Sequence, residues 1–186
     1  MKKLQRLVRA GKVDLWALDE VHFQQYGSRC RMWVPPEVCE PVLLHSPTRR
    51  SVGYFGAVRL RDGKFLFRRE DDRFNAKTFL AFLRSLKQVA KRGSRPAVVI
   101  TDNAKYHHAV LHKEWRAQNA KILRLDFLPP YSPELNPIER VWKLTRRLSL
   151  HNRYFESIEA VVSSVECEFT KWSYPNETLR RLCAIT

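Results

Sequence analysis

Three acidic residues, Asp19, Asp102 and Glu139, each lie where a predicted strand ends or a predicted helix begins. Carboxylate oxygens are the ligands that hard divalent cations such as Mg²⁺ prefer. Two such ions, about 3.5 to 4 Å apart, can activate water and stabilise the leaving oxygen in phosphodiester cleavage. The alternative for any one of these acids is an ordinary solvated or helix-capping role. Taken together, the three acids indicate metal-dependent chemistry on a phosphodiester.

Glu139 has the most specific alternative role. The segment Asn136-Pro137-Ile138-Glu139 is close to a capping box, in which Asn136 caps a helix and Glu139 reaches back to the backbone. Both interpretations place Glu139 at a helix start, but a metal ligand must face Asp19 and Asp102. The sequence leaves both open.

The first elements of the chain are predicted to be strands. Residues 14–23 alternate apolar and polar side chains, which is typical of a strand, with the acidic residues at its far end. Residues 52–60 and 65–69 follow as two more strands, joined by a turn at Asp62-Gly63 where glycine tolerates a positive φ. These segments predict a three-stranded meander.

Helices and strands alternate in the rest of the chain. Residues 97–100 are wholly apolar, which is typical of a strand covered on both faces, and Asp102 follows at its carboxyl end, a usual place for chemistry. The other predicted elements are a helix over 75–91 ended by Gly93 and Pro96, a helix over 106–118, a strand over 122–127, a helix over 136–150 and a terminal helix over 158–172. This order predicts an α/β fold of the ribonuclease-H-like kind, a mixed five-stranded sheet flanked by helices, as a single domain over 1–186.

The charge of the chain favours a polyanionic partner. Its 186 residues include 34 Lys and Arg against 19 Asp and Glu, which gives a net charge of +15. Nucleic acid is the leading candidate, although a membrane surface would tolerate the same charge. No apolar run approaches the roughly eighteen residues that span a bilayer, and no signal-peptide core follows the basic start. We therefore expect a soluble, intracellular protein.

The cysteines give no sign of a metal site or a disulfide framework. Cys30, Cys39, Cys167 and Cys183 include no Cys-x-x-Cys pair. We interpret them as reduced thiols.

Three segments carry a resemblance to a known family. The longest is LPPYSPELNPIE at residues 128–139, followed by Val141-Trp142. TDNAKYH at 101–107 contains Asp102 and LDEVHF at 18–23 contains Asp19, with 36 residues between Asp102 and Glu139. Over essentially the whole chain, these segments resemble Tc/mariner superfamily DDE transposases, especially their bacterial insertion-sequence branch.

The resemblance implies a role for each acid. Asp19 would bridge two Mg²⁺ ions, for which Mn²⁺ can substitute, while Asp102 would hold one ion and Glu139 the other. The resemblance places four further side chains around these ligands: Glu20, Asn103, His107 and Asn136. His107 would contact a phosphate or orient a carboxylate, and a structural hydrogen bond explains it equally well.

The resemblance also implies an activity. The domain would cleave DNA at transposon ends and transfer the freed 3′ hydroxyl into target DNA at a TA dinucleotide, as a homodimer, in the cytoplasm and associated with the nucleoid of a bacterium or archaeon. One alternative is a domesticated, non-catalytic DNA-binding remnant, and another is a nuclease of this fold without strand transfer. The basic residues expected to contact DNA are Arg29, Arg31, Arg49, Arg50, Lys105, Arg146 and Arg147.

The sequence also predicts a long loop and the absence of a DNA-recognition module. Residues 26–50 hold four prolines and many charges without periodicity, and they lie where the family places a segment that reaches DNA or the partner subunit. Trp33 in this loop would serve that contact or fill a gap in the core. Nothing ahead of Asp14 could form the helix-turn-helix module of full-length members, so we expect a catalytic fragment, a split-gene product or a remnant.

Overall fold

A mixed five-stranded sheet runs through the centre of the protein, in the order β3-β2-β1-β4-β5. The strands are β1 (Asp14–Gln24), β2 (Ser51–Arg59), β3 (Phe65–Glu70), β4 (Ala97–Thr101) and β5 (Leu123–Phe127). The first three pair antiparallel, and β4 and β5 extend the sheet in parallel from β1. The predicted meander and the predicted five-stranded mixed sheet are therefore confirmed.

The structure is a computed structural model that describes residues 6–8, 10–38, 42, 44, 47–71 and 73–184. Cys39 and residues 40, 41, 43, 45 and 46 of the long loop lie outside this description. Cys30, Cys167 and Cys183 are free thiols. Among the described residues, no helix has both the length and the apolar character needed to cross a bilayer.

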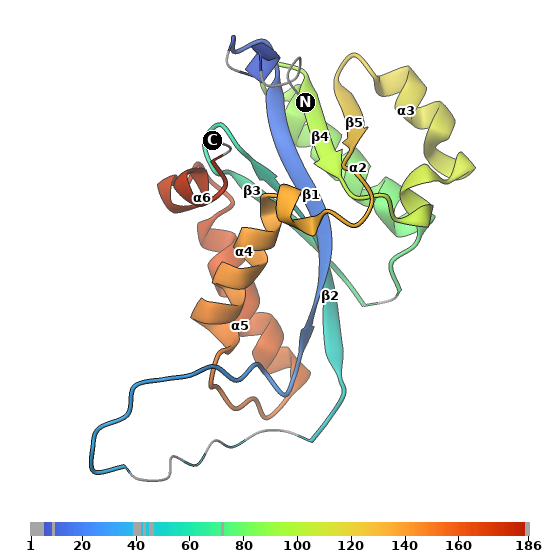
Figure 1. The fold of residues 1–186 in the computed structure, drawn as a ribbon. Coiled ribbons are helices and arrows are strands. Elements are labelled where there is room, and N and C mark those ends of the chain that lie inside the picture. Colours follow the sequence, from blue (N-terminus) through green and yellow to red (C-terminus); the bar gives the residue numbers. More distant parts are fainter. Residues whose placement is uncertain are drawn as a thin grey trace.

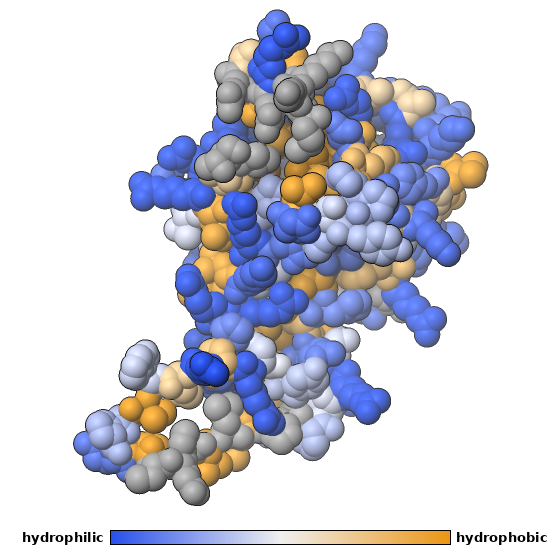
Figure 2. Space-filling view, viewed as in Figure 1, coloured by the Kyte–Doolittle hydropathy of each residue, from blue (hydrophilic) through white to orange (hydrophobic). Residues whose placement is uncertain are grey.

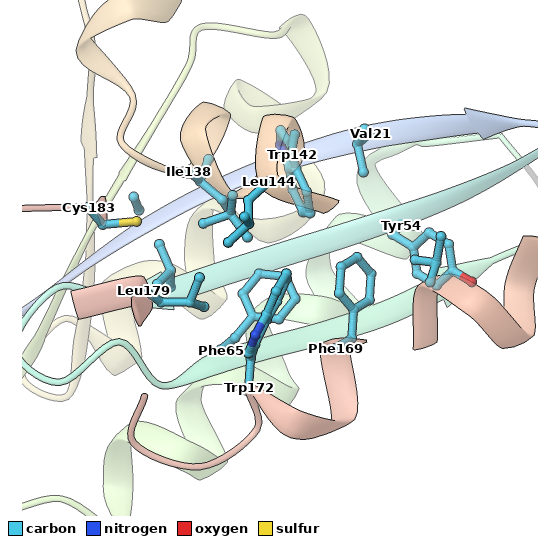
Figure 3. Packing of buried hydrophobic residues seen from close by; sticks show 14 of the residues in the cluster. Val21, Tyr54, Phe65, Ile138, Trp142, Leu144, Phe169, Trp172, Leu179 and Cys183 are labelled. Carbon is cyan, nitrogen blue, oxygen red and sulfur yellow. The ribbon is translucent and has the colours of Figure 1, made fainter. Parts of the chain in front are cut away.

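Helices cover both faces of the sheet (Figure 1). One face packs against α2 (Ala76–Lys91), which begins at a capping box formed by Asn75 and buries Phe79, Phe82, Leu83 and Leu86. The other face packs against α4 (Ile138–Thr145) and α5 (Ile158–Lys171), and α6 (Glu177–Leu182) closes one end. Figure 3 shows the aromatic core on this second face, where Phe65 and Phe169 are in ring contact with each other and with both Trp142 and Trp172. Two separate cores therefore hold the sheet between them.

The turn between β2 and β3 requires its glycine. Gly63 has a φ of +70° and lies against the backbone of α6, where an added Cβ would come within 2.1 Å of the Asn176 carbonyl oxygen. This close approach, as well as the left-handed backbone, accounts for glycine at the predicted turn.

The predicted helix over 106–118 is wrong in its first half. The chain forms two 3₁₀ turns, η1 (Lys105–His108) and η2 (Val110–His112), before α3 (Lys113–Asn119). His112 Nε2 lies 2.8 Å from the Tyr106 carbonyl oxygen, within hydrogen-bond distance of an acceptor that a continuous helix would use. Inward packing of the histidines, against Phe79, therefore replaces the regular helical bonds.

The predicted helix over 136–150 starts later and changes its winding. Asn136 has extended backbone angles, so α4 begins at Ile138, and after Thr145 the chain continues as a π-helical turn, η4 (Arg146–Leu150). The long loop contains no named helix or strand in its described part, as predicted, and it leads away from the body of the protein (Figure 1). Trp33 is fully exposed, so its interpretation as a core residue is wrong.

Candidate active site

The three predicted acids line one cavity of about 410 Å³. Asp102 follows directly on β4, as predicted, and Glu139 lies in the first turn of α4. Asp19 is the sixth of the eleven residues of β1, so its prediction at the end of that strand is wrong. The pairing of β1 with β4 stops at Ala17, so Asp19 projects just beyond this parallel pair although its strand continues beside β2.

Asn136 fixes the start of α4 against β1. Its side-chain amide donates to the Leu18 carbonyl oxygen at 3.1 Å, next to Asp19, and the residue is buried. The N-cap of α4 is Pro137, and no side chain caps this helix. The capping-box interpretation of Asn136 and Glu139 is therefore wrong. The Asn136 Oδ1 atom is buried without a hydrogen-bond partner, in the residue that lines the cavity beside Asp19 and Glu139.

Trp142 holds Asp19 from the same helix. Its indole Nε1 donates to Asp19 Oδ2 at 3.1 Å, and the ring is almost wholly buried. Gly56 is the register partner of Asp19 on β2, and a Cβ there would lie 2.3 Å from the Trp142 ring. Local sequence pattern gives no signal for the roles of Trp142 and Gly56, because their contact crosses between distant segments.

The cavity concentrates negative charge. Burial raises the pKa of Asp19 to about 8, with further contributions from the neighbouring charges of Glu20 and Glu139, and the Trp142 hydrogen bond opposes the rise in part. Without a cation, Asp19 therefore retains its proton at neutral pH. The cavity is lined by carboxylate and amide oxygens, which are the ligands that a hard divalent cation prefers. The residues present thus fit the predicted metal.

A tighter cluster lies beside this cavity. Within the described residues, Glu20, Asp102 and His107 are the one trio of potential metal-binding side chains whose ligand atoms all lie within 4.8 Å of one another. Within the described residues, the ligand atoms of Asp19, Asp102 and Glu139 do not form a group as tight as this trio. Asp102 is held by His107, whose Nδ1 lies 2.8 Å from Asp102 Oδ1. This hydrogen bond is the largest cause that keeps the pKa of Asp102 below its ordinary value.

Asn103 has a structural contact on each side. Its side-chain amide donates to the Leu128 carbonyl oxygen, and its Oδ1 lies 3.1 Å from His108 Nε2. His108 stacks in turn on Phe127 of β5. Asn103 therefore joins the end of β4 to the segment 128–133 that forms one wall of the cavity. The sequence had offered no functional interpretation of His108.

The residues predicted to contact DNA are spread over several surfaces. Arg29, Arg31, Arg49 and Arg50 are exposed in the long loop, and Lys105 is exposed in η1, close to Asp102 in the chain. Arg146 is half-buried over the Phe23 ring and lines a second cavity of about 490 Å³ together with Arg29, while Arg147 is exposed. None of these seven cations is ion-paired with a described acidic residue. Figure 2 shows hydrophilic side chains over most of the visible face, with apolar ones on the described part of the projecting loop.

Comparisons with known proteins agree with this description. Residues 14–162 match the family described as DDE superfamily endonuclease. Over 67 residues, the chain is 42% identical to the uncharacterized protein y4pE/y4sA of Sinorhizobium fredii (strain NBRC 101917 / NGR234), a match that covers 36% of this chain and 46% of that protein.

Among solved structures, the Mos1 strand transfer complex matches with a TM-score of 0.69 and 19% identity, over 98% of this chain and 54% of that chain. The catalytic domain of Mos1 mariner transposase matches with a TM-score of 0.65 and 16% identity, over 98% of this chain and 81% of that chain. The Mos1 mariner paired-end complex with Mn matches with a TM-score of 0.69 and 17% identity, over 98% of this chain and 55% of that chain. The chain thus spans about half the length of the full-length relatives it matches. At these identities the likeness shows a shared fold, and the ribonuclease-H-like prediction is confirmed.

Proposed function

Because the chain belongs to the DDE superfamily of endonucleases, we propose that it is a metal-dependent transposase catalytic domain with Asp19, Asp102 and Glu139 as its metal ligands. The observation that carries this proposal is the shared cavity, into which three separate elements bring the three acids. The raised pKa of Asp19 supports it, because a bound cation would offset both the burial and the neighbouring negative charges that keep this carboxyl protonated.

The metal in this proposal is Mg²⁺, with Mn²⁺ as a substitute, and two ions in each site. Asp19 would contact both ions, Asp102 one and Glu139 the other. When bound, the ions supply an activated water and stabilise charge on the leaving 3′ oxygen. Matched structures of Mos1 with Mn and with Mg support this choice of metal.

Residues of the chain perform the positioning. Trp142 and Asn136 hold Asp19 and the start of α4 in register, so that Glu139 faces the same cavity as Asp19. Asn103 fixes the wall formed by residues 128–133. A scissile phosphate that enters the cavity would therefore meet carboxylates from three directions, with their supports on rigid elements.

The proposed substrate is DNA, first at the transposon ends and then at the target. The net charge of +15 and the seven basic side chains that form no ion pair with a described acidic residue support a partner with a phosphate backbone. We propose in addition a homodimer on DNA, insertion at TA dinucleotides, and a cytoplasmic, nucleoid-associated location. The DNA complexes among the Mos1 structures support the first of these assignments.

Plasmid nicking with Mg²⁺ tests the catalytic assignment. Wild-type protein should nick supercoiled DNA, and Glu139→Gln should reduce the rate at least 100-fold, since a metal ligand loses its charge. The matched control is Glu134→Gln, five residues earlier, exposed and outside the cavity lining, which should nick at the wild-type rate. Equal nicking by Glu139→Gln would refute the assignment.

Joining of a pre-cleaved transposon end to target DNA separates this function from its alternative. A transposase domain should give joined products with Mg²⁺. Nicking without any joined product would favour a nuclease of the same fold.

A further inference from the structure

The side chain of Glu20 projects from the face of β1 opposite to that of Asp19, because successive side chains of a strand point to opposite sides. On that face it meets the η1 turn, which follows Asp102 by three residues. The Tyr106 hydroxyl donates to Glu20 Oε1, and His107 Nε2 lies 3.6 Å from Glu20 Oε2. The side chain of Glu20 is therefore engaged with this turn and is turned away from the shared cavity.

His107 connects Glu20 to Asp102. Its ring is fully buried, whereas half of the Asp102 side chain is exposed, and its Nδ1 lies 2.8 Å from Asp102 Oδ1. The ring is clamped between Phe79 of α2, with centroids 4.2 Å apart, and Tyr106, with centroids 4.5 Å apart. Arg116 of α3 donates to the His107 carbonyl oxygen at 3.1 Å. The imidazole is thus fixed from several elements.

The two side-chain oxygens of Asp102 differ in their hydrogen bonds. Oδ1 accepts from the Ala104 backbone N–H at 3.1 Å as well as from His107. Among the described residues, no group is hydrogen-bonded to Oδ2. One oxygen is held by the protein, and the other is left for a ligand in the cavity that Asp102 lines.

We propose that Tyr106, Glu20 and His107 form a positioning relay, which holds Asp102 Oδ1 so that Oδ2 is presented to the catalytic metal. This inference rests on the proposed function, because it requires Asp102 to be a metal ligand. His107 acts through Asp102 and touches neither substrate nor metal. Groups that orient a ligating carboxylate in this way stabilise metal binding by reducing the freedom that the ligand must lose.

Glu20, Asp102 and His107 lie close enough to hold a metal ion, but the imidazole already engages both acids. The two ring nitrogens of His107 face different carboxylates, Nδ1 toward Asp102 and Nε2 toward Glu20. A metal among these three side chains would have to replace the contacts that the imidazole already makes with the two acids. Glu20 Oε2 and His107 Nε2 are both buried without a hydrogen-bond partner, and at 3.6 Å their contact is the loosest in the relay.

The test is the affinity of the protein for Mn²⁺ alone, measured by the electron paramagnetic resonance signal of the free ion. In His107→Asn, the side-chain amide lies near the former Nδ1 and can still donate to Asp102. In His107→Gln, the amide lies near the former Nε2 and cannot. We expect His107→Gln to weaken Mn²⁺ binding about tenfold and His107→Asn to stay within about threefold of wild type.

Tyr106→Phe provides a second variant that removes one hydroxyl and leaves the buried imidazole in place. It should weaken Mn²⁺ binding by a factor of about three, because Glu20 loses its donor. The matched control is Tyr174→Phe, which removes an exposed hydroxyl far from the relay in the sequence and should change nothing. Circular dichroism spectra establish that each variant is folded.

Wild-type Mn²⁺ affinity in both His107→Gln and Tyr106→Phe would overturn the relay. Equal losses in His107→Asn and His107→Gln, together with one bound ion fewer, would also overturn it, because the imidazole would then itself be a ligand. Either result leaves the triad intact if Glu139→Gln still abolishes nicking. A wild-type protein that neither binds Mn²⁺ nor nicks DNA would instead reject the proposed function.

Discussion

The indole nitrogen of Trp142 donates a hydrogen bond to Asp19 Oδ2 at 3.1 Å, across the boundary between α4 and β1. This bond lowers the pKa of Asp19 against the larger, opposing effect of burial. A core tryptophan therefore also lowers the pKa of the residue that we propose to bridge the metals.

Trp142→Phe should weaken metal binding more than it weakens the fold. The smaller ring keeps most of the packing but removes the hydrogen bond, so the pKa of Asp19 should rise further and less metal should bind at pH 7. Mg²⁺ titrations of the nicking rate should show a higher half-saturating concentration, partly restored at pH 9. The control is Trp172→Phe in the same core, where no carboxylate is contacted. An equal rise in both variants would show that packing alone is responsible.

Asp19→Asn should change how stability depends on pH in metal-free protein. The folded pKa of Asp19 is about 8, against an ordinary value of 3.8. Because the folded state binds this proton more tightly, the contribution of Asp19 to stability should be full below about pH 4 and should be lost as the pH rises toward 8. Each unit of pKa difference corresponds to about 1.4 kcal/mol.

Urea melts in EDTA between pH 4.5 and 8.5 measure this effect. Asp19→Asn should lose less stability over that range and should exceed the wild type at pH 8.5. Parallel curves for the two proteins would contradict the raised pKa.

Asp102→Asn should have the opposite effect on the metal-free fold. The pKa of Asp102 is lowered by its hydrogen bond with His107, so its charged form stabilises the folded state at neutral pH and this contribution is lost as the pH falls through the folded pKa. The variant should therefore melt at a lower temperature than wild type in EDTA, and Mg²⁺ should no longer raise its melting temperature. DNA affinity at low salt should be equal or slightly higher, since one negative charge is removed. A Mg²⁺-induced rise of wild-type size in this variant would exclude Asp102 as a ligand.

DNA binding by this chain should depend steeply on salt and little on sequence. Arg29, Arg31, Arg49, Arg50, Lys105 and Arg147 are exposed cations suited to phosphates, and each phosphate contact contributes about 0.9 to the slope of log affinity against log salt concentration. Arg31→Ala should reduce that slope by about one unit for every sequence tested. Arg61→Ala is the control, because Arg61 is already paired with Asp14 at 3.1 Å. Fluorescence anisotropy with two unrelated duplexes measures both quantities, and strong preference for one duplex at high salt would reveal a recognition element.

Local sequence patterns predict most of the elements and the positions of two of the three acids at element ends. The wholly apolar run at residues 97–100 identifies a buried strand, so Asp102 at its end is found correctly. Asp19 is misplaced within its strand because the length of β1 depends on its antiparallel partner, which extends the strand seven residues beyond Ala17. Local pattern carries no information about that partner.

The contacts that hold the acids are not visible in local patterns. Trp142 reaches Asp19 across 123 positions and Tyr106 reaches Glu20 across 86. Both pairs depend on which face of β1 each side chain occupies, and therefore on the sheet register. The broken helix after Asp102 has the same origin, because the inward contacts of its histidines outweigh helical propensity.

The location of Mn²⁺ in crystals of this protein, found from its anomalous scattering, tests the central claim most directly. We expect anomalous peaks in the cavity lined by Asp19, Asp102 and Glu139, with His107 hydrogen-bonded to Asp102 and outside the coordination sphere. A peak bound by Glu20, Asp102 and His107, with none between Asp19 and Glu139, would contradict the assigned triad.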